Sequence, residues 1–411
     1  MAAERNGIWC HYVNMEKTKL LITTLKQGIV AAYYDNNRLL QANVEPKESE
    51  SILGNIYLGQ VKNIVKNINA AFVEYEKGKM CYLSLKDTEG AVFANPKKNN
   101  KVCEGDTIVV QISKEDVKTK APVATACFGF TGKYLVLTHG KTKLSVSTKI
   151  SSEEERERLK NILKPYQKEA YGCILRTNAQ GASEEELLRE LRVLDGLYQN
   201  IIEFGIHKGK YALLYQAPAN FLCSIRDGQA ESLSEIVTDE KELYEKIKEY
   251  LSCYQIEDLN KLRFYEDTTT TLNRLYGIET ALSKAVAKQV WLKSGGTLVI
   301  EPTEALTVID VNTGKAIKGN KKVQETFFKV NMEAAKEIAF QLRLRNLSGI
   351  IIVDFIDMDS EEHKKELLKS LKAYLKDDPM KAVVVDMTPL GLVEITRKKL
   401  RKPLHEQLHR L

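Results

Sequence analysis

The chain has 411 residues, of which 43% are hydrophobic and 28% are charged, and its formal net charge is +6. This length exceeds one ordinary hydrophobic core and predicts about two to four domains, while the small charge excess does not by itself indicate nucleic-acid binding. No apolar stretch approaches the ~20 residues of a membrane-spanning helix, and residues 1–6 lack a signal-peptide pattern, so we expect a cytoplasmic protein without a membrane span.

Short strands dominate the first third of the chain. Residues 19–24, 28–34 and 38–40 are apolar runs separated by turns, and they predict a β-meander. Residues 52–130 predict a second β-rich block, in which glycines and charged turns separate the strands, as in a small barrel. The strands expected in this block are residues 56–61, 70–75, 79–83 and 107–112.

The middle of the chain mixes helices and strands. The segments SSEEE at 151–155 and SEEE at 183–186 resemble helix N-caps followed by acidic first turns. Between them, residues 172–177 predict a strand that runs into a polar turn. Two further helical patterns flank a strand at residues 261–265.

Residues 291–402 follow the order strand, strand, helix, strand, helix, strand, which indicates α/β architecture. The first helix is expected over residues 323–345, where apolar side chains recur on one helical face. The expected apolar positions are Val323, Phe327, Val330, Ala334, Ile338 and Leu342. The final strand is expected at residues 382–386.

Two apolar runs of this last region each lead into an aspartate. Asp310 lies in LTVIDVN at 306–312, and Asp354 lies in GIIIVDFIDM at 349–358. Both runs are short and rich in β-branched residues, which predicts buried strands, and open α/β sheets bind ligands at the carboxyl ends of their strands.

One connecting helix can place these two strands side by side or one strand apart. The two carboxylates could then share one divalent cation, with Asn312 and Asp357 close enough to complete its shell. The alternative is that each aspartate bonds a local backbone amide, as is common at strand ends.

Two other groups could bind nucleic acid or anions. Phe72, Tyr82 and Lys120 lie in the barrel region, where exposed aromatic rings beside lysines stack unpaired bases; the alternative is that Phe72 belongs to the core. Arg176 and Thr177 end a predicted strand and could bind an anion through guanidinium, hydroxyl and backbone amides; the alternative is an arginine paired with a nearby glutamate.

Three other patterns carry less weight. The basic run KAIKGNKK at 315–322 follows Asp310 and favours a phosphate-bearing ligand, although alone it is typical of a solvated loop. Gly140-Lys141-Thr142 lacks the earlier glycine of a phosphate loop, because position 135 is leucine. HEQLH at 405–409 matches the zinc-protease pattern, but no following segment supplies a third ligand, and we reject it.

Several longer segments resemble the bacterial ribonuclease E/G family. Residues 294–314, 331–358 and 391–397 are similar to its catalytic and closing motifs. NIYLGQV at 55–61 and AAFVEY at 70–75 resemble its RNA-binding barrel, and GKYLVL at 132–137 and ILRT at 174–177 resemble its 5′-sensing region.

The resemblance implies an α/β and β multidomain fold. A ribonuclease-H-like subdomain at 1–45 and 226–286 is interrupted by an OB-fold barrel at 46–127 and a 5′-sensor at 128–225. A deoxyribonuclease-I-like α/β catalytic subdomain at 287–411 follows.

The resemblance also implies an endoribonuclease that cleaves single-stranded RNA in RNA processing or decay and is stimulated by a 5′-monophosphate. Asp310 and Asp354 would bind Mg²⁺, or alternatively Mn²⁺, and Asn312 would orient the site. Phe72, Tyr82 and Lys120 would contact RNA, and Arg176 and Thr177 would bind the 5′-phosphate. The alternative function is a non-catalytic RNA-binding protein.

The chain also departs from the family pattern. No cysteine follows Cys253, so the cysteine pair that links two protomers through zinc in this family is missing, and we expect no structural zinc. A homodimer is therefore only one possible assembly. We likewise expect no scaffold tail for a degradosome. The loop KTKAPV at 118–123 differs from the family's glycine-containing version and weakens the placement of Lys120.

Overall fold

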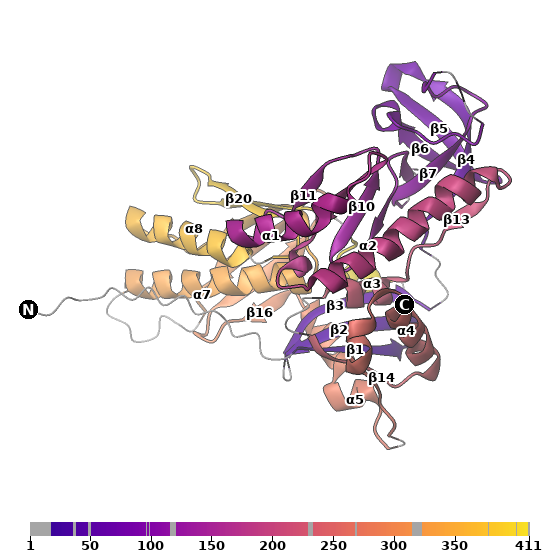
Figure 1. The fold of residues 1–411 in the computed structure, drawn as a ribbon. Coiled ribbons are helices and arrows are strands. Elements are labelled where there is room, and N and C mark those ends of the chain that lie inside the picture. The colour runs from indigo at the N-terminus through magenta and orange to yellow at the C-terminus, as the bar shows by residue number, and fades with distance from the viewer. Residues whose placement is uncertain are drawn as a thin grey trace, which may run out of the picture. The chain divides into compact units, whose positions relative to one another are not determined.

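The computed structural model describes residues 18–35, 38–47, 51–95, 97, 99–115, 121–228, 233–267, 269–314, 323–376, 378–399 and 401–409 (Figure 1). The chain forms two compact units. The first unit consists of Met1–Lys47, Ser232–Tyr244 and Lys261–Leu411, and the second consists of Glu48–Glu231 and Glu245–Asn260. Among the described residues, no helix is both long and apolar enough to cross a membrane.

The first unit contains a five-stranded sheet in the order β15-β14-β1-β2-β3. Its strands are β1 (Thr18–Leu25), β2 (Gly28–Asp35), β3 (Arg38–Pro46), β14 (Leu233–Thr238) and β15 (Leu262–Phe264). β1, β2 and β3 are antiparallel, which confirms the predicted β-meander, and β14 and β15 extend it in parallel. The helices α5 (Leu272–Tyr276), α6 (Ile278–Ala285) and α9 (Leu404–Leu408) contribute to its hydrophobic core.

The segment that matches the zinc-protease pattern has a structural role in this unit. Gln407 of α9 is buried, and its amide oxygen accepts a 2.8 Å hydrogen bond from the backbone N–H of Val44 in β3. Its amide nitrogen donates to the Lys402 carbonyl at 2.6 Å. The segment therefore fastens the described C-terminal residues to the meander.

The second unit contains a closed five-stranded barrel, drawn in indigo and purple in Figure 1. Its strands are β4 (Ile56–Val65), β5 (Ala70–Glu76), β6 (Lys79–Ser84), β8 (Val123–Thr125) and β7 (Thr107–Lys114), with β7 pairing back onto β4. Short 3₁₀ turns occupy Lys66–Ile68 and Leu85–Thr88, and β13 (Leu213–Tyr215) adds to the edge of β4. The barrel predicted from the sequence is confirmed and is compatible with an OB-fold.

A four-stranded sheet in the order β11-β12-β10-β9 completes the second unit. Its strands are β9 (Gly129–Thr131), β10 (Leu135–His139), β11 (Leu144–Val146) and β12 (Tyr171–Leu175). The helices are α1 (Glu153–Leu163), α2 (Glu184–Gln199), α3 (Asn220–Asp227) and α4 (Lys241–Tyr254), the last of which begins in the first unit. Ser152 and Ser183 cap α1 and α2 through their side chains, which confirms the predicted N-caps.

The first unit also contains a six-stranded sheet in the order β16-β17-β18-β19-β21-β20. Its strands are β16 (Gln289–Trp291), β17 (Thr297–Pro302), β18 (Leu306–Asn312), β19 (Gly349–Asp354), β20 (Ala382–Met387) and β21 (Val393–Arg397). β18 and β19 are parallel, and the other neighbours are antiparallel. This sheet and its two helices confirm the predicted α/β architecture.

The two long helices α7 (Val323–Leu344) and α8 (Glu361–Lys376) lie next to each other (Figure 1). Both contribute to the hydrophobic core of the six-stranded sheet. Of the apolar face expected for α7, Val330, Ala334, Ile338 and Leu342 are buried, Phe327 is half-buried and Val323 is exposed. α7 therefore forms as predicted, except that its first residue lies outside the core.

The expectation that residues 382–386 form the last strand is wrong, because β21 follows β20 and lies between β19 and β20. β21 is only five residues long, and polar Glu394 and Thr396 interrupt its apolar positions. So short a run has little sequence signal. Its inward residues, Val393 and Ile395, are fully buried in the core.

Arg397 ends β21 in a buried ion pair. Its guanidinium donates to both carboxylate oxygens of Asp378, at 2.8 and 3.1 Å, and these side chains are only 2% and 1% exposed. The remaining nitrogen donates to the Asn346 side chain at 3.1 Å and to the Leu347 carbonyl at 2.9 Å. Each guanidinium nitrogen is thus paired, as a buried charge requires. This part of the closing motif has a structural role.

Candidate active site and anion-binding loop

The register of one parallel strand pair brings the two predicted metal ligands together. Asp310 of β18 and Asp354 of β19 are directly opposite partners in the parallel ladder. Neighbouring strands lie about 4.8 Å apart. Because a Mg²⁺ ion binds oxygen at about 2.1 Å, two carboxylates on the same face of such a pair can reach one ion.

The alternation of each strand decides which face carries these carboxylates. The flanking residues Ile309, Val311 and Val353 are buried in the core formed with α7 and α8. Successive strand residues point to opposite faces. Asp310 and Asp354 therefore project from the face that these two helices do not cover, where Asp310 is half-buried and Asp354 is exposed.

A third and a fourth polar side chain lie beside this pair. The amide nitrogen of Asn312 donates a 2.6 Å hydrogen bond to Asp310 Oδ2. Although Asp354 is exposed, partial loss of hydration at its carboxylate raises its pKa above the usual value, and the negative charges of Asp310 and Asp357 raise it further. Asp310 and Asp357 are therefore each close enough to repel Asp354, and a bound cation would relieve that repulsion.

The donor set fits a hard cation. In the part of the chain that the structure describes, no three His, Cys, Asp or Glu side chains are grouped to hold a metal ion by themselves. Mg²⁺ is commonly bound by one or two carboxylates and keeps several waters. Two aspartates, with oxygen donors from Asn312 and Asp357 nearby, match that coordination better than they match zinc.

Asn331 of α7 positions the loop that follows Asp354. The side chain is fully buried, donates to the Ile356 carbonyl at 2.8 Å and accepts from the Ile356 N–H at 3.0 Å. Asp357 follows directly, and a Cβ added at Gly391, before β21, would lie 4.0 Å from the Asp357 Oδ1 atom. Asn331 is not among the site residues predicted from the sequence, although an asparagine among the apolar positions of α7 is an available signal.

The predicted base-stacking residues lie next to each other on the outside of the barrel. Phe72 of β5 and Tyr82 of β6 are cross-strand partners, and their rings meet edge to face with centroids 6.2 Å apart. Both are half-buried, whereas their sequence neighbours Val73 and Leu83 are in the barrel core. Phe72 is therefore not a core residue. Lys120 lies outside the described residues, as does the basic run at 315–322.

Arg176 and Thr177 follow β12, at the start of a short polar turn. The Arg176 guanidinium donates to the Gly132 carbonyl at 2.6 Å and forms a 2.8 Å ion pair with Asp227 at the end of α3. The Thr177 hydroxyl lies 3.0 Å from the Ser147 hydroxyl. The alternative interpretation of the sequence is an arginine paired with a nearby glutamate. Arg176 is indeed paired, but its partner is an aspartate 51 residues away in the sequence.

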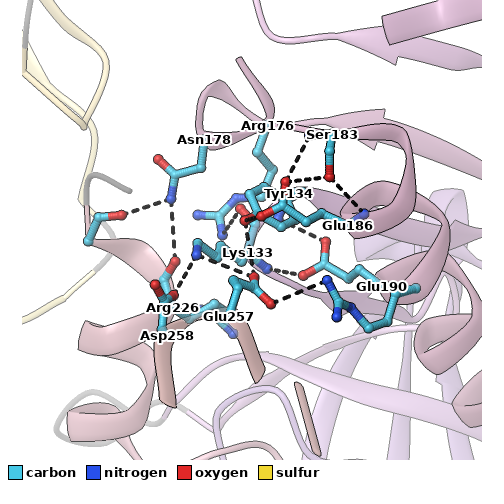
Figure 2. Close-up of polar contacts among 12 residues, drawn as sticks. Lys133, Tyr134, Arg176, Asn178, Ser183, Glu186, Glu190, Arg226, Glu257 and Asp258 are labelled. Atoms are coloured by element: carbon cyan, nitrogen blue, oxygen red, sulfur yellow. Dashed lines mark hydrogen bonds and ion pairs between the residues drawn. The ribbon is translucent and has the colours of Figure 1, made fainter. Parts of the chain in front are cut away.

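A buried carboxylate holds the hairpin that faces Arg176. Glu190 of α2 accepts backbone hydrogen bonds from Lys133 and Tyr134 at 2.5 and 2.8 Å (Figure 2). It also accepts one from the Leu135 N–H at 2.7 Å. Burial raises the pKa of Glu190 to about 7, although these backbone bonds and the charge of Arg176 oppose the rise. A Cβ at Gly132 would lie 2.4 Å from this carboxylate, so a larger residue there would displace Glu190 from its backbone hydrogen bonds.

The same hairpin is also tied to the segment after α4. Lys133 is buried, and its ammonium group binds Asp258 at 2.5 Å and Glu257 at 3.4 Å (Figure 2). The Tyr134 hydroxyl donates to Glu257 at 3.0 Å, and burial raises the pKa of Tyr134. The hairpin is therefore rigidly held on both sides, which keeps the carbonyl groups that bind Arg176 in place.

The sequence profile of the Ribonuclease E/G family matches residues 129–400. Ribonuclease G of Haemophilus influenzae is 38% identical over 408 residues, which cover 96% of this chain and 82% of that protein. The chain belongs to the ribonuclease E/G family. Ribonuclease G of Escherichia coli K12 is 35% identical over 400 residues, covering 95% of this chain and 81% of that protein. Ribonuclease E of Haemophilus influenzae is 30% identical over 403 residues, covering 96% of this chain and 43% of that protein.

This membership confirms the family predicted from the sequence motifs and the predicted enzyme class, an endoribonuclease. The matched region includes both aspartates, Asn331 and the loop of Arg176 and Thr177.

We predict that Asn331→Ala destabilises the protein by about 2–3 kcal/mol, because two hydrogen bonds to Ile356 are lost at a buried site. Urea unfolding measures this change, and amide exchange at Ile356 should accelerate. Gln324→Ala is the matched control, since Gln324 lies on the same helix and accepts from the exposed Asp359 N–H. Equal stability of the two variants would contradict the role of Asn331.

Proposed function

We propose that this protein is a Mg²⁺-dependent endoribonuclease that cleaves single-stranded RNA at Asp310 and Asp354, in RNA processing or decay. The in-register pairing of the two aspartates on one sheet face is the observation that carries the proposal. Mn²⁺ should substitute, because it prefers the same oxygen ligands. The products would carry 5′-phosphate and 3′-hydroxyl ends.

The residues of the site have distinct roles in this proposal. Asp310 and Asp354 hold the cation, and the Asn312 amide fixes the Asp310 carboxylate through its 2.6 Å hydrogen bond. Asn331 keeps the following loop, and with it Asp357, beside the pair. When bound, the ion would polarise the scissile phosphate and lower the pKa of an attacking water.

The raised pKa of Asp354 gives the site a pH dependence. Cation binding needs the ionised carboxylate, so metal affinity should fall as the pH drops toward this raised pKa. The stability of the metal-free protein should change with pH in the opposite direction to the metal affinity. A carboxyl group whose pKa is raised in the folded state stabilises that state at low pH, and this stabilisation is lost as the pH rises through the raised pKa.

We predict that Asp310→Asn and Asp354→Asn each abolish Mg²⁺-dependent cleavage, because each removes one of two anionic ligands. Folding and RNA binding should persist. The parent protein should also melt at a higher temperature with Mg²⁺ than without it, and this difference should vanish in both variants.

Asp359→Asn is the matched control, because Asp359 is an exposed aspartate on the same loop. Unchanged cleavage by Asp354→Asn would overturn the metal site. A parent protein that shifts RNA but yields no product with Mg²⁺ would instead support the alternative, a non-catalytic RNA-binding protein.

We propose that Phe72 and Tyr82, with Lys120, form the RNA-binding surface of the barrel. The paired aromatic side chains on the outer barrel face support this role, since unpaired bases stack on such rings. Phe72→Ala and Tyr82→Ala should each weaken binding of a short single-stranded RNA about tenfold, the effect of losing one stacked base at ~1–3 kcal/mol.

A fluorescence titration measures this loss. Tyr166→Ala is the control, because Tyr166 is an exposed aromatic residue of the same unit on the turn after α1. An equal loss in all three variants, or none at Phe72 and Tyr82, would argue against a specific surface.

We further propose that Arg176 and Thr177 bind the 5′-monophosphate of the RNA. The guanidinium, the hydroxyl and a hairpin held by backbone bonds support an anion site there. The parent protein should cleave a 5′-monophosphorylated RNA faster than its 5′-hydroxyl counterpart, and Arg176→Ala should narrow this gap. Equal rates for the two RNAs in the parent would end the sensor proposal.

The finer fold assignment and the assembly are also proposals. We assign the five-stranded sheet to a ribonuclease-H-like subdomain and the six-stranded sheet to a deoxyribonuclease-I-like subdomain, with the predicted boundaries. Superposition of an experimental structure on those two folds tests this assignment.

The six-stranded sheet has exposed apolar side chains that support a homodimer through this sheet. They are Ile350, Val383 and Val385, which are 51%, 41% and 52% exposed. A monomeric mass in sedimentation equilibrium would exclude that dimer.

A further inference from the structure

The proposed 5′-phosphate site already contains an anion supplied by the protein. Asp227 Oδ1 accepts from Arg176 Nη2 at 2.8 Å and from Arg226 Nε at 3.0 Å, and Asp227 Oδ2 accepts from Arg226 Nη2 at 3.1 Å. One carboxylate is therefore shared between two guanidinium groups. Arg226 binds it with two N–H donors and Arg176 with one.

The position of Asp227 is electrostatically unfavourable without these arginines. It is the last residue of α3, where the helix dipole disfavours a negative charge. Two cations on this carboxylate offset that cost. Arg226 also donates to the Thr131 carbonyl at 3.3 Å, next to the hairpin that Glu190 holds.

Arg176 does not depend on Asp227 for its place. Its Nη1 donates to the Gly132 and Lys133 carbonyls at 2.6 and 3.4 Å. The neighbouring turn is fastened separately, because the Asn178 amide donates to the Gly228 carbonyl at 2.8 Å and to the Arg226 carbonyl at 3.4 Å (Figure 2). A ligand can therefore replace Asp227 at Nη2 while Nη1 keeps its bonds to the two carbonyl groups.

We propose that Asp227 is an internal competitor of the RNA 5′-phosphate and sets how strongly this site distinguishes a monophosphate from a hydroxyl. The inference rests on the proposed binding of the 5′-phosphate at Arg176. A terminal phosphate carries a charge near −2 at neutral pH and outcompetes a single carboxylate for Nη2, whereas a neutral hydroxyl does not. Asp227 is exposed and keeps its two bonds to Arg226 during the exchange, so its charge stays paired and in contact with water.

The test compares Asp227→Asn with the parent protein on two oligonucleotides of one sequence, carrying a 5′-monophosphate or a 5′-hydroxyl. Dissociation constants are measured without divalent cations, so that no cleavage occurs. We expect the 5′-monophosphorylated RNA to bind roughly three- to tenfold more tightly to Asp227→Asn, because one contact-distance negative charge is removed at a partly exposed site. Binding of the 5′-hydroxyl RNA should change less than twofold.

Two further variants sharpen the result. Arg226→Gln should weaken binding of the 5′-monophosphorylated RNA, because Asp227 loses the two Arg226 donors and then competes more strongly for Arg176. The effects of Asp227→Asn and Arg226→Gln on this binding should therefore be opposite in sign. Asp195→Asn is the charge control: Asp195 is a half-buried aspartate of the same unit that pairs with Lys168 and Tyr171. It should leave the preference for the monophosphate unchanged.

The failure of this inference is distinct from the failure of the proposed sensor. If the parent binds and cleaves both RNAs equally, the sensor itself is absent. If the parent prefers the monophosphate but Asp227→Asn leaves that preference unchanged or reduces it, Asp227 only holds Arg176 and the inference is overturned. An equal gain in Asp195→Asn would overturn it as well, since the effect would then be one of net charge.

Discussion

The candidate active site depends on the parallel register between β18 and β19. Because side chains alternate along a strand, a slip of one residue would send one of the two aspartates into the core under α7 and α8. The buried residues Ile309, Ile351 and Val353 prevent that slip, since their burial is lost if the register changes. The hydrophobic effect thus fixes the positions of two charged groups that have no attraction for each other.

Bringing like charges together has a consequence for the rest of the site. Desolvation raises the pKa of Asp354 most, and the repulsion adds to it, so the metal-free pair is held together by its surroundings rather than by its own interactions. Asn312 bonds to one carboxylate, and Asn331 fixes the loop behind the other. The fold therefore bears the cost of assembling the site before any ligand binds, as preorganisation requires.

Sequence patterns predict those parts of the fold and of the site whose residues lie close together in the chain. The apolar runs before Asp310 and Asp354, the serine N-caps of α1 and α2 and the alternating strands of the barrel are all recognisable within a few residues. The contacts of Asn331 with Ile356 and of Arg176 with Asp227 span 25 and 51 residues, so no local pattern contains them. β21 was missed for a related reason, since five alternating residues become a strand only when β19 and β20 lie on either side.

The two proposed sites share one structural device. In each, a buried polar side chain on a helix binds the backbone of a functional loop: Asn331 on α7 holds Ile356, and Glu190 on α2 holds residues 133–135. A backbone clamp fixes the path of the loop without using the loop's own side chains, although Lys133 and Tyr134 are tied separately to Asp258 and Glu257. Arg176 lies outside the clamped residues, and its contact with Asp227 is where its response to an RNA end can be adjusted.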